Sequence, residues 1–151
     1  MSDERDACAL VSIARKDGRP SREVLDGVLR GMAALAHRSG LVDGEGDGAG
    51  VLTDIPRDLW ANVLRTAGRD ATLVRGGRFA VAHLFVPPTD ADADQAAVRR
   101  SLVRHGIEIL VERQSATDSG VLGPRGRTEE PIFWQLALLA PSRDAPGSRA
   151  L

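Results

Sequence analysis

The chain has 151 residues and a net charge of −1 from 20 basic and 21 acidic side chains, and its 42% of hydrophobic residues includes few aromatics and no Tyr. This length fits one domain with an aliphatic core. The near-neutral charge gives no reason to expect nucleic acid or an anionic membrane as a partner, so we expect neither. No apolar run approaches the ~20 residues of a membrane span, and the acidic start lacks the apolar stretch of a secretory signal, so we expect a cytoplasmic protein.

The N-terminal part of the chain predicts a strand, a turn and a helix. Residues 8–14 form a short apolar run that is typical of a buried strand, and a turn cluster follows at 16–20. Ser21 is a suitable helix N-cap. Beyond it, apolar residues recur at helical spacing, so we expect a helix over about 21–37.

The middle of the chain alternates loops, helices and strands. The Gly-rich and acidic run 39–50 predicts a loop, and it lacks both the Lys of a phosphate loop and the spacing of a calcium loop. A short strand is expected at 51–54. Pro56 fits the start of a second helix over about 57–67. The clearest strand covers 79–86 and stops at two prolines.

The last third predicts a helix at 91–105, a strand at 107–112, a loop at 114–131 and a final strand at 132–139. The polar tail 141–151, with Pro and Gly, is typical of a disordered segment. Periodicity therefore indicates mixed helix and strand, without fixing how the strands are wound.

Three motifs in chain order carry a resemblance to a known family. They are Asp6-Ala7-Cys8 at the start of the first predicted strand, His37-Arg38-Ser39-Gly40 at the end of the first helix, and the run GDGAGVLTDIP from Gly46 to Pro56. Together they resemble the start of the class II glutamine amidotransferase domain of glutamate synthase, and a weaker match continues to about Pro141.

The resemblance implies an α+β fold of the Ntn-hydrolase type, a four-layer αββα sandwich with two stacked antiparallel sheets, of which this chain would hold part. It implies a leader-like segment at 1–7, a partial glutamine amidotransferase domain at 8–140 and the tail at 141–151. It also implies that Cys8 is the nucleophile, that Arg38 lies near the glutamine site, and that any flavin belongs to later domains. With one cysteine in the chain, we expect no metal and no cofactor here.

The chemistry of Cys8 requires a free amino group. A thiol attacks as its thiolate, and the α-amine of an N-terminal cysteine, with a pKa of about 7.7–8.0, can accept the thiol proton. The hypothesis therefore requires cleavage between Ala7 and Cys8. The sulfur would attack the side-chain amide of glutamine, release ammonia and leave a γ-glutamyl thioester that water hydrolyses to glutamate. The alternative is that Cys8 is only a small apolar side chain in a strand.

Arg38 also has two interpretations. Its guanidinium could hold the α-carboxylate of glutamine through bidentate hydrogen bonds, or it could be only a cation at a helix C-terminus. We interpret His83 as a hydrogen-bonded core residue and Arg99 as part of a solvated helix face. Trp60 and Trp134 are expected to be core or interface anchors.

The chain departs from the family pattern where the reaction would take place. Ala9 stands where the family usually has Gly, and Ser39 separates Arg38 from the next glycine. The Asn-Gly pair that supplies oxyanion donors in this family has no counterpart, because the only Asn, Asn62, precedes a valine.

We therefore expect catalysis to need a partner, either the remaining glutamate-synthase-like subunit or a second copy in a homo-oligomer. The alternatives left open are a non-catalytic binding or regulatory module and a truncated remnant with the same fold.

Overall fold

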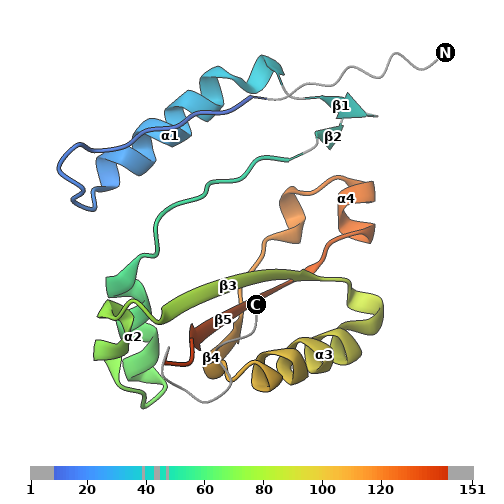
Figure 1. Cartoon of the computed structure of the whole chain (residues 1–151). Helices are drawn as coiled ribbons and strands as arrows, with labels where there is room; N and C mark the ends of the chain where they lie inside the picture. The colour runs from blue at the N-terminus through green and yellow to red at the C-terminus, as the bar shows by residue number, and fades with distance from the viewer. Residues whose placement is uncertain (1–8, 39, 43–44, 47, 143–151) are drawn as a thin grey trace. The chain divides into compact units, whose positions relative to one another are not determined.

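The computed structural model describes residues 9–38, 40–42, 45–46 and 48–142, and the chain divides into an N-terminal unit, 1–52, and a C-terminal unit, 53–151. The N-terminal unit contains α1 (Arg22–Ala34), the 3₁₀ helix η1 (Ala36–Arg38) and the short strands β1 (Leu41–Val42) and β2 (Glu45–Gly46) (Figure 1). The C-terminal unit contains, in order, α2 (Arg57–Thr66), η2 (Ala71–Arg75), β3 (Phe79–Val86), η3 (Pro88–Asp90), α3 (Ala91–Arg104), β4 (Glu108–Gln114), η4 (Ser119–Val121), α4 (Pro124–Thr128) and β5 (Ile132–Leu139).

The C-terminal unit is built on a three-stranded sheet of order β3-β5-β4. Strand β5 runs antiparallel to both neighbours, and its pairing with β3 extends over the whole strand, from Phe79 opposite Leu139 to Val86 opposite Ile132. Because β3 and β4 both oppose β5, they are parallel to each other, and α3 connects them across the strand that separates them. The described residues thus form a mixed α+β structure with antiparallel pairing, which confirms that part of the expected fold class.

Each face of this sheet carries a hydrophobic cluster because successive strand residues point to opposite faces. On β5, Trp134, Leu136 and Leu138 belong to the cluster that α3 covers, and α3 runs along that face in Figure 1. Ala137 belongs instead to the cluster that α2 and η2 complete with Trp60, Leu64 and Val74. Both tryptophans are 3% exposed, so the prediction that they anchor the core is confirmed.

The face that carries α2 is open at its other end. Phe85 on β3 is 65% exposed and meets Phe133 on β5 edge to face, with ring centroids 5.0 Å apart. One row closer to α2, Gln135 Nε2 donates a hydrogen bond to His83 Nδ1 at 3.1 Å. The expected hydrogen bond of His83 is therefore present, but the prediction that His83 lies in the core is wrong, because this end of the face is uncovered and His83 is exposed.

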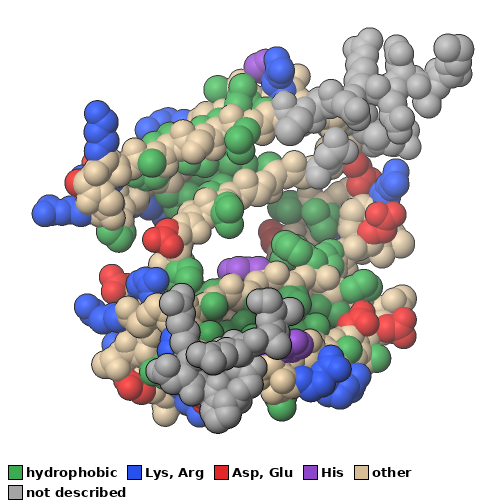
Figure 2. Space-filling view, viewed as in Figure 1, with side chains coloured by type: hydrophobic (Ala, Val, Ile, Leu, Met, Phe, Trp, Pro, Cys, Tyr) green, Lys and Arg blue, Asp and Glu red, His purple; other side chains and the backbone are tan. Residues whose placement is uncertain are grey.

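Arg99 connects α3 to the sheet instead of being a freely solvated side chain. Its Nη2 atom donates to Glu112 Oε2 at 2.7 Å and its Nε atom to both carboxylate oxygens, and this hydrogen bonding raises the pKa of Arg99. Its guanidinium carbon also lies 5.0 Å from the centre of the Trp134 ring. The prediction of a purely solvated face is wrong for Arg99, although basic side chains do gather over α3 on the face drawn in Figure 2.

Four other local expectations differ from the structure. Neither the described residues 9–14 nor the segment 51–54 forms a strand, because a strand needs a hydrogen-bonded neighbour and neither segment has one among the described residues. The predicted loop 39–50 contains the β1–β2 pair, and the predicted loop 114–131 contains η4 and α4. The predicted tail lies almost wholly outside the described residues.

Candidate functional site

Helix α1 positions the second family motif. Glu23 N donates to the Ser21 side chain at 3.2 Å, which confirms Ser21 as the N-cap. At the other end, His37 Nδ1 lies 3.1 Å from the Ala34 carbonyl oxygen, so the ring satisfies one of the free carbonyls of the helix end. The helix ends here, and its apolar side chains stay visible along it in Figure 2.

Arg38 is the last residue of η1, directly after α1. Its backbone N–H donates to the Leu35 carbonyl at 2.8 Å, which fixes the main chain, while its side chain is exposed to solvent. An exposed guanidinium at this position can bind a carboxylate in the two-pronged geometry that arginine favours. Its place at a helix C-terminus also agrees with the alternative of a cation that only favours the helix dipole.

The described segment after Cys8 lies against α1 through two glycines. A Cβ built on Gly31 would lie 2.8 Å from Val11 Cγ1 and 3.0 Å from Val11 Cγ2, and a Cβ on Gly27 would lie 3.0 Å from Ile13 Cδ1. These approaches are closer than ordinary carbon–carbon contacts of ~3.5–4.0 Å. The bare backbone of α1 therefore forms a notch, here called the glycine notch (Gly27 and Gly31), that receives the side chains of Val11 and Ile13.

Cys8 itself lies outside the described residues, so its distance to Arg38 is not defined by the structure. Of the two candidate site residues, the structure describes Arg38 only. Sequence reasoning missed the glycine notch, although glycines four residues apart in an amphipathic helix are a readable signal of a close approach on one helix face.

The Gly-rich motif contains one position that requires glycine. Gly48 has φ +89, a conformation that side chains other than glycine rarely adopt. Further along, Ile55 N donates to Asp54 Oδ1 at 2.8 Å, which shapes the chain just before α2. The glycine at position 48 is thus explained by local backbone geometry.

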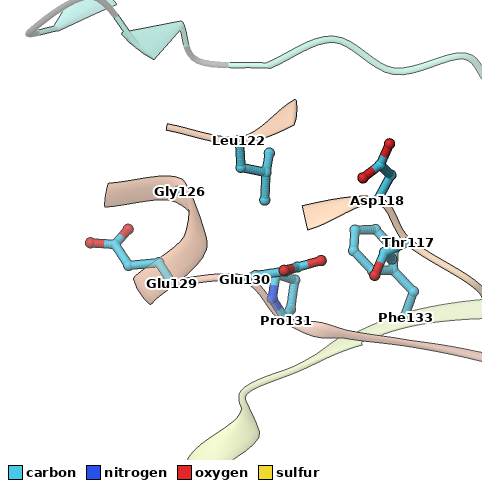
Figure 3. Close-up of a pocket in the computed structure, with 8 residues that line it drawn as sticks. All are labelled: Thr117, Asp118, Leu122, Gly126, Glu129, Glu130, Pro131 and Phe133. Carbon is cyan, nitrogen blue, oxygen red and sulfur yellow. The ribbon is translucent and has the colours of Figure 1, made fainter. Parts of the chain in front are cut away.

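The C-terminal unit has a shallow hollow beside β5, lined by residues 117–133 (Figure 3). Leu122 points into it, Phe133 and Pro131 contribute apolar walls, and Asp118 and Glu130 lie at its edge. The Asp118 carboxylate also accepts a hydrogen bond from Gly120 N at 3.0 Å, so it has a structural role in the η4 turn. Its lining residues include no predicted site residue that the structure describes.

Among the residues that the structure describes, no group of three His, Cys, Asp or Glu side chains is arranged to hold a metal ion. Within the same residues, no helix combines the length and apolar character needed to cross a bilayer.

Comparison with known proteins gives a consistent result. The family model for class-II glutamine amidotransferases matches residues 8–148. Ferredoxin-dependent glutamate synthase 2 of Synechocystis is 31% identical over 145 residues, which is 93% of this chain but 9% of that protein. The glutamate synthase [NADPH] large chain of Azospirillum brasilense is 29% identical over 89% of this chain, and the chloroplastic ferredoxin-dependent enzyme of Spinacia oleracea is 30% identical over 88%. The chain thus spans less than a tenth of the length of these relatives.

Proposed function

Because this chain belongs to the class II glutamine amidotransferases, we propose that it contributes glutamine hydrolysis of the glutamate-synthase type, with Cys8 as the nucleophile and Arg38 as the group that holds the substrate carboxylate. The relatives are glutamate synthases by name, and this chain corresponds to a small part of each. The proposed substrate is glutamine, and the products are ammonia and glutamate.

The observation that supports this pairing is the course of residues 9–14 along α1. Ile13 faces Gly27 and Val11 faces Gly31, so the segment and the helix run in opposite directions. Four helical residues rise ~6 Å and two extended residues span ~7 Å, so both advance at nearly the same pace. The described course thus runs from Ile13 to Val11 toward the end of α1 that Arg38 follows.

The proposed reaction requires the amine of Cys8 to be free. After cleavage of the Ala7–Cys8 bond, the amine accepts the thiol proton and the thiolate attacks the δ-carbon of glutamine. The carbon–nitrogen bond breaks, the amine returns the proton to the departing ammonia, and the γ-glutamyl thioester remains. Water then adds to the thioester carbonyl. The carbon–sulfur bond breaks, which releases glutamate and restores the thiol of Cys8.

We further propose that the complete domain is an αββα sandwich in which another layer covers the open end around Phe85. The support is that α3 covers one face of the sheet, while α2 and η2 cover only part of the other. The missing layer and the oxyanion donors would come from the remaining glutamate-synthase-like part, which is why we expect ammonia release to depend on that partner. A second copy of this chain is the alternative source.

Labelling of Cys8 by an electrophilic glutamine analogue tests the proposal, because Cys8 is the only thiol. Intact mass should show loss of residues 1–7 and addition of one analogue, and a form lacking residues 2–7 should react in the same way once Met1 is removed. Cys8→Ala should abolish both labelling and partner-dependent ammonia release.

Arg38 is tested in the same assay. Arg38→Ala should weaken glutamine binding, and Arg38→Lys should restore it only in part, because lysine lacks the planar two-pronged donor. Arg30→Ala is the matched control, since Arg30 is an exposed arginine on α1, in the same N-terminal unit. A mature chain that retains Ala7, or an Arg38→Ala protein as reactive as the control, would refute the corresponding part of the proposal.

A further inference from the structure

We propose that Gly31, supported by Gly27, is a positioning residue for the proposed reaction, because the glycine notch fixes where the segment carrying Cys8 lies along α1. This inference rests on the proposed function and adds to it the contact that holds residues 9–14, the segment that follows Cys8, against α1.

The contact at Gly31 has little tolerance. The absent Cβ would lie 2.8 Å and 3.0 Å from the two γ-carbons of Val11, and only 3.4 Å from its Cβ. A side chain at position 31 would therefore push the 9–14 segment outward by ~1 Å to reach ordinary van der Waals distance. At Gly27 the approaching atom is the terminal Cδ1 of Ile13 at 3.0 Å, a flexible tip that can rotate away. Gly31 is thus the stricter of the two positions.

The glycine notch sets the position of residues 9–14 along α1 without burying them. None of residues 9–38 is buried, and Leu10, which lies in sequence between Val11 and Cys8, is 88% exposed. The segment therefore has no buried core contact to hold it, and the seating of Val11 and Ile13 is what sets its register on α1. A shift of ~1 Å at a reacting group can cost on the order of 10²-fold in rate.

The test uses the full chain and a compensating pair of substitutions. Gly31→Ala adds the clashing Cβ, Val11→Ala removes the two γ-carbons, and the double variant relieves the clash while keeping both changes. Two rates of Cys8 alkylation are measured, one with the electrophilic glutamine analogue and one with iodoacetamide, a small reagent with no need for alignment. Gly77→Ala is the control, since a Cβ there meets no atom within 4 Å.

The expected result is that Gly31→Ala slows the analogue reaction on the order of 10²-fold, leaves the iodoacetamide rate unchanged, and is rescued by Val11→Ala. An unchanged analogue rate in Gly31→Ala would overturn the positioning role. Equal loss of both rates without rescue would also overturn it, because that pattern indicates general damage to α1.

Failure of the proposed function gives a different pattern. If the unmodified chain shows no preference for the analogue, the chemistry assigned to Cys8 fails, and the notch is judged separately from NMR contacts between the Val11 methyl groups and the Gly31 α-protons. If these contacts are present in the unmodified chain, the proposed fixed register of residues 9–14 on α1 stands. If they are absent, it is refuted.

Discussion

The two units of the chain differ in what holds them together. All ten buried hydrophobic residues among the described positions belong to the C-terminal unit, whereas none of residues 9–38 in the N-terminal unit is buried. Yet the N-terminal unit carries Cys8, Arg38 and most of the Gly-rich motif. The proposed chemistry and the stabilising core thus occupy different parts of the sequence, so a substitution that affects one should leave the other largely unchanged.

The largest expected effect comes from emptying the core of the C-terminal unit. Leu136 is 0% exposed on the central strand, so Leu136→Ala should lower the free energy of unfolding by about 2–5 kcal/mol. Leu10→Ala is the matched change in the N-terminal unit. Because Leu10 is 88% exposed, it should change the free energy by less than ~0.5 kcal/mol. Denaturant unfolding followed by far-UV circular dichroism, which reports the helices of both units, measures both. Similar losses in the two variants would break the comparison, because they would reveal a core around Leu10.

A smaller effect is expected from the ion pairs. Arg99 connects α3 to β4 through Glu112 and lies over Trp134, so Arg99→Ala should cost about 1 kcal/mol, a modest value because the pair is partly solvated. Arg15 in the N-terminal unit pairs with Asp17, two residues away, and at 4.0 Å with Glu23 of α1, whose side chain is 90% exposed, so its loss removes only solvated ion pairs. Arg15→Ala should therefore leave the unfolding curve unchanged. A double-mutant cycle of Arg99→Ala with Glu112→Gln measures the coupling, and a coupling near zero would contradict the proposed connection.

The smallest effect concerns acid. The Asp70 carboxylate accepts hydrogen bonds from the backbone N–H of Thr72, which has the larger effect, and from the Thr72 hydroxyl. Both lower the pKa of that carboxyl below its ordinary value of 3.8. Since the folded pKa is the lower one, the stabilisation is present above the unfolded pKa and is lost as pH falls through the folded pKa. Asp70→Asn should therefore flatten the loss of stability below about pH 4.

Asp17 provides the comparison for this prediction. The pKa of Asp17 is also lowered, mainly by the hydrogen bond from the Arg15 side chain and to a smaller extent by the hydrogen bond from the Arg19 backbone N–H. Both tryptophans belong to the C-terminal unit, so Asp17→Asn should not change an acid titration of their fluorescence. Two variants with the same acid slope would show that the units respond to acid together.

Sequence patterns predicted best where local rules and packing agree. The strand Phe79–Val86 was expected with its observed bounds because β-forming residues run up to two prolines, and Ile132–Leu139 because a continuous apolar run predicts a strand buried on both faces. The apolar run 8–14 has similar composition, but pattern alone cannot provide the neighbouring strand that pairing requires, and the described part of this run packs on α1 instead.

The candidate site was predictable in part for the same reason. The helical spacing places Arg38 correctly at the end of α1 and η1. The glycine notch depends on the distance between Val11 and Gly31, twenty residues apart in the sequence, and no periodicity reports such a distance. His83 failed as a core prediction because alternation along a strand shows which face a residue shares, but not how far a covering helix extends over that face.

The order of strands in the sheet has a consequence for synthesis of the protein. Strands β3 and β4 are not hydrogen-bonded to each other, and the strand that lies between them, Ile132–Leu139, comes last in the sequence. A growing chain therefore cannot close any of the sheet's hydrogen bonds until that final strand has left the ribosome. Until then the apolar sides of β3 and β4 remain available to chaperones or to unwanted association.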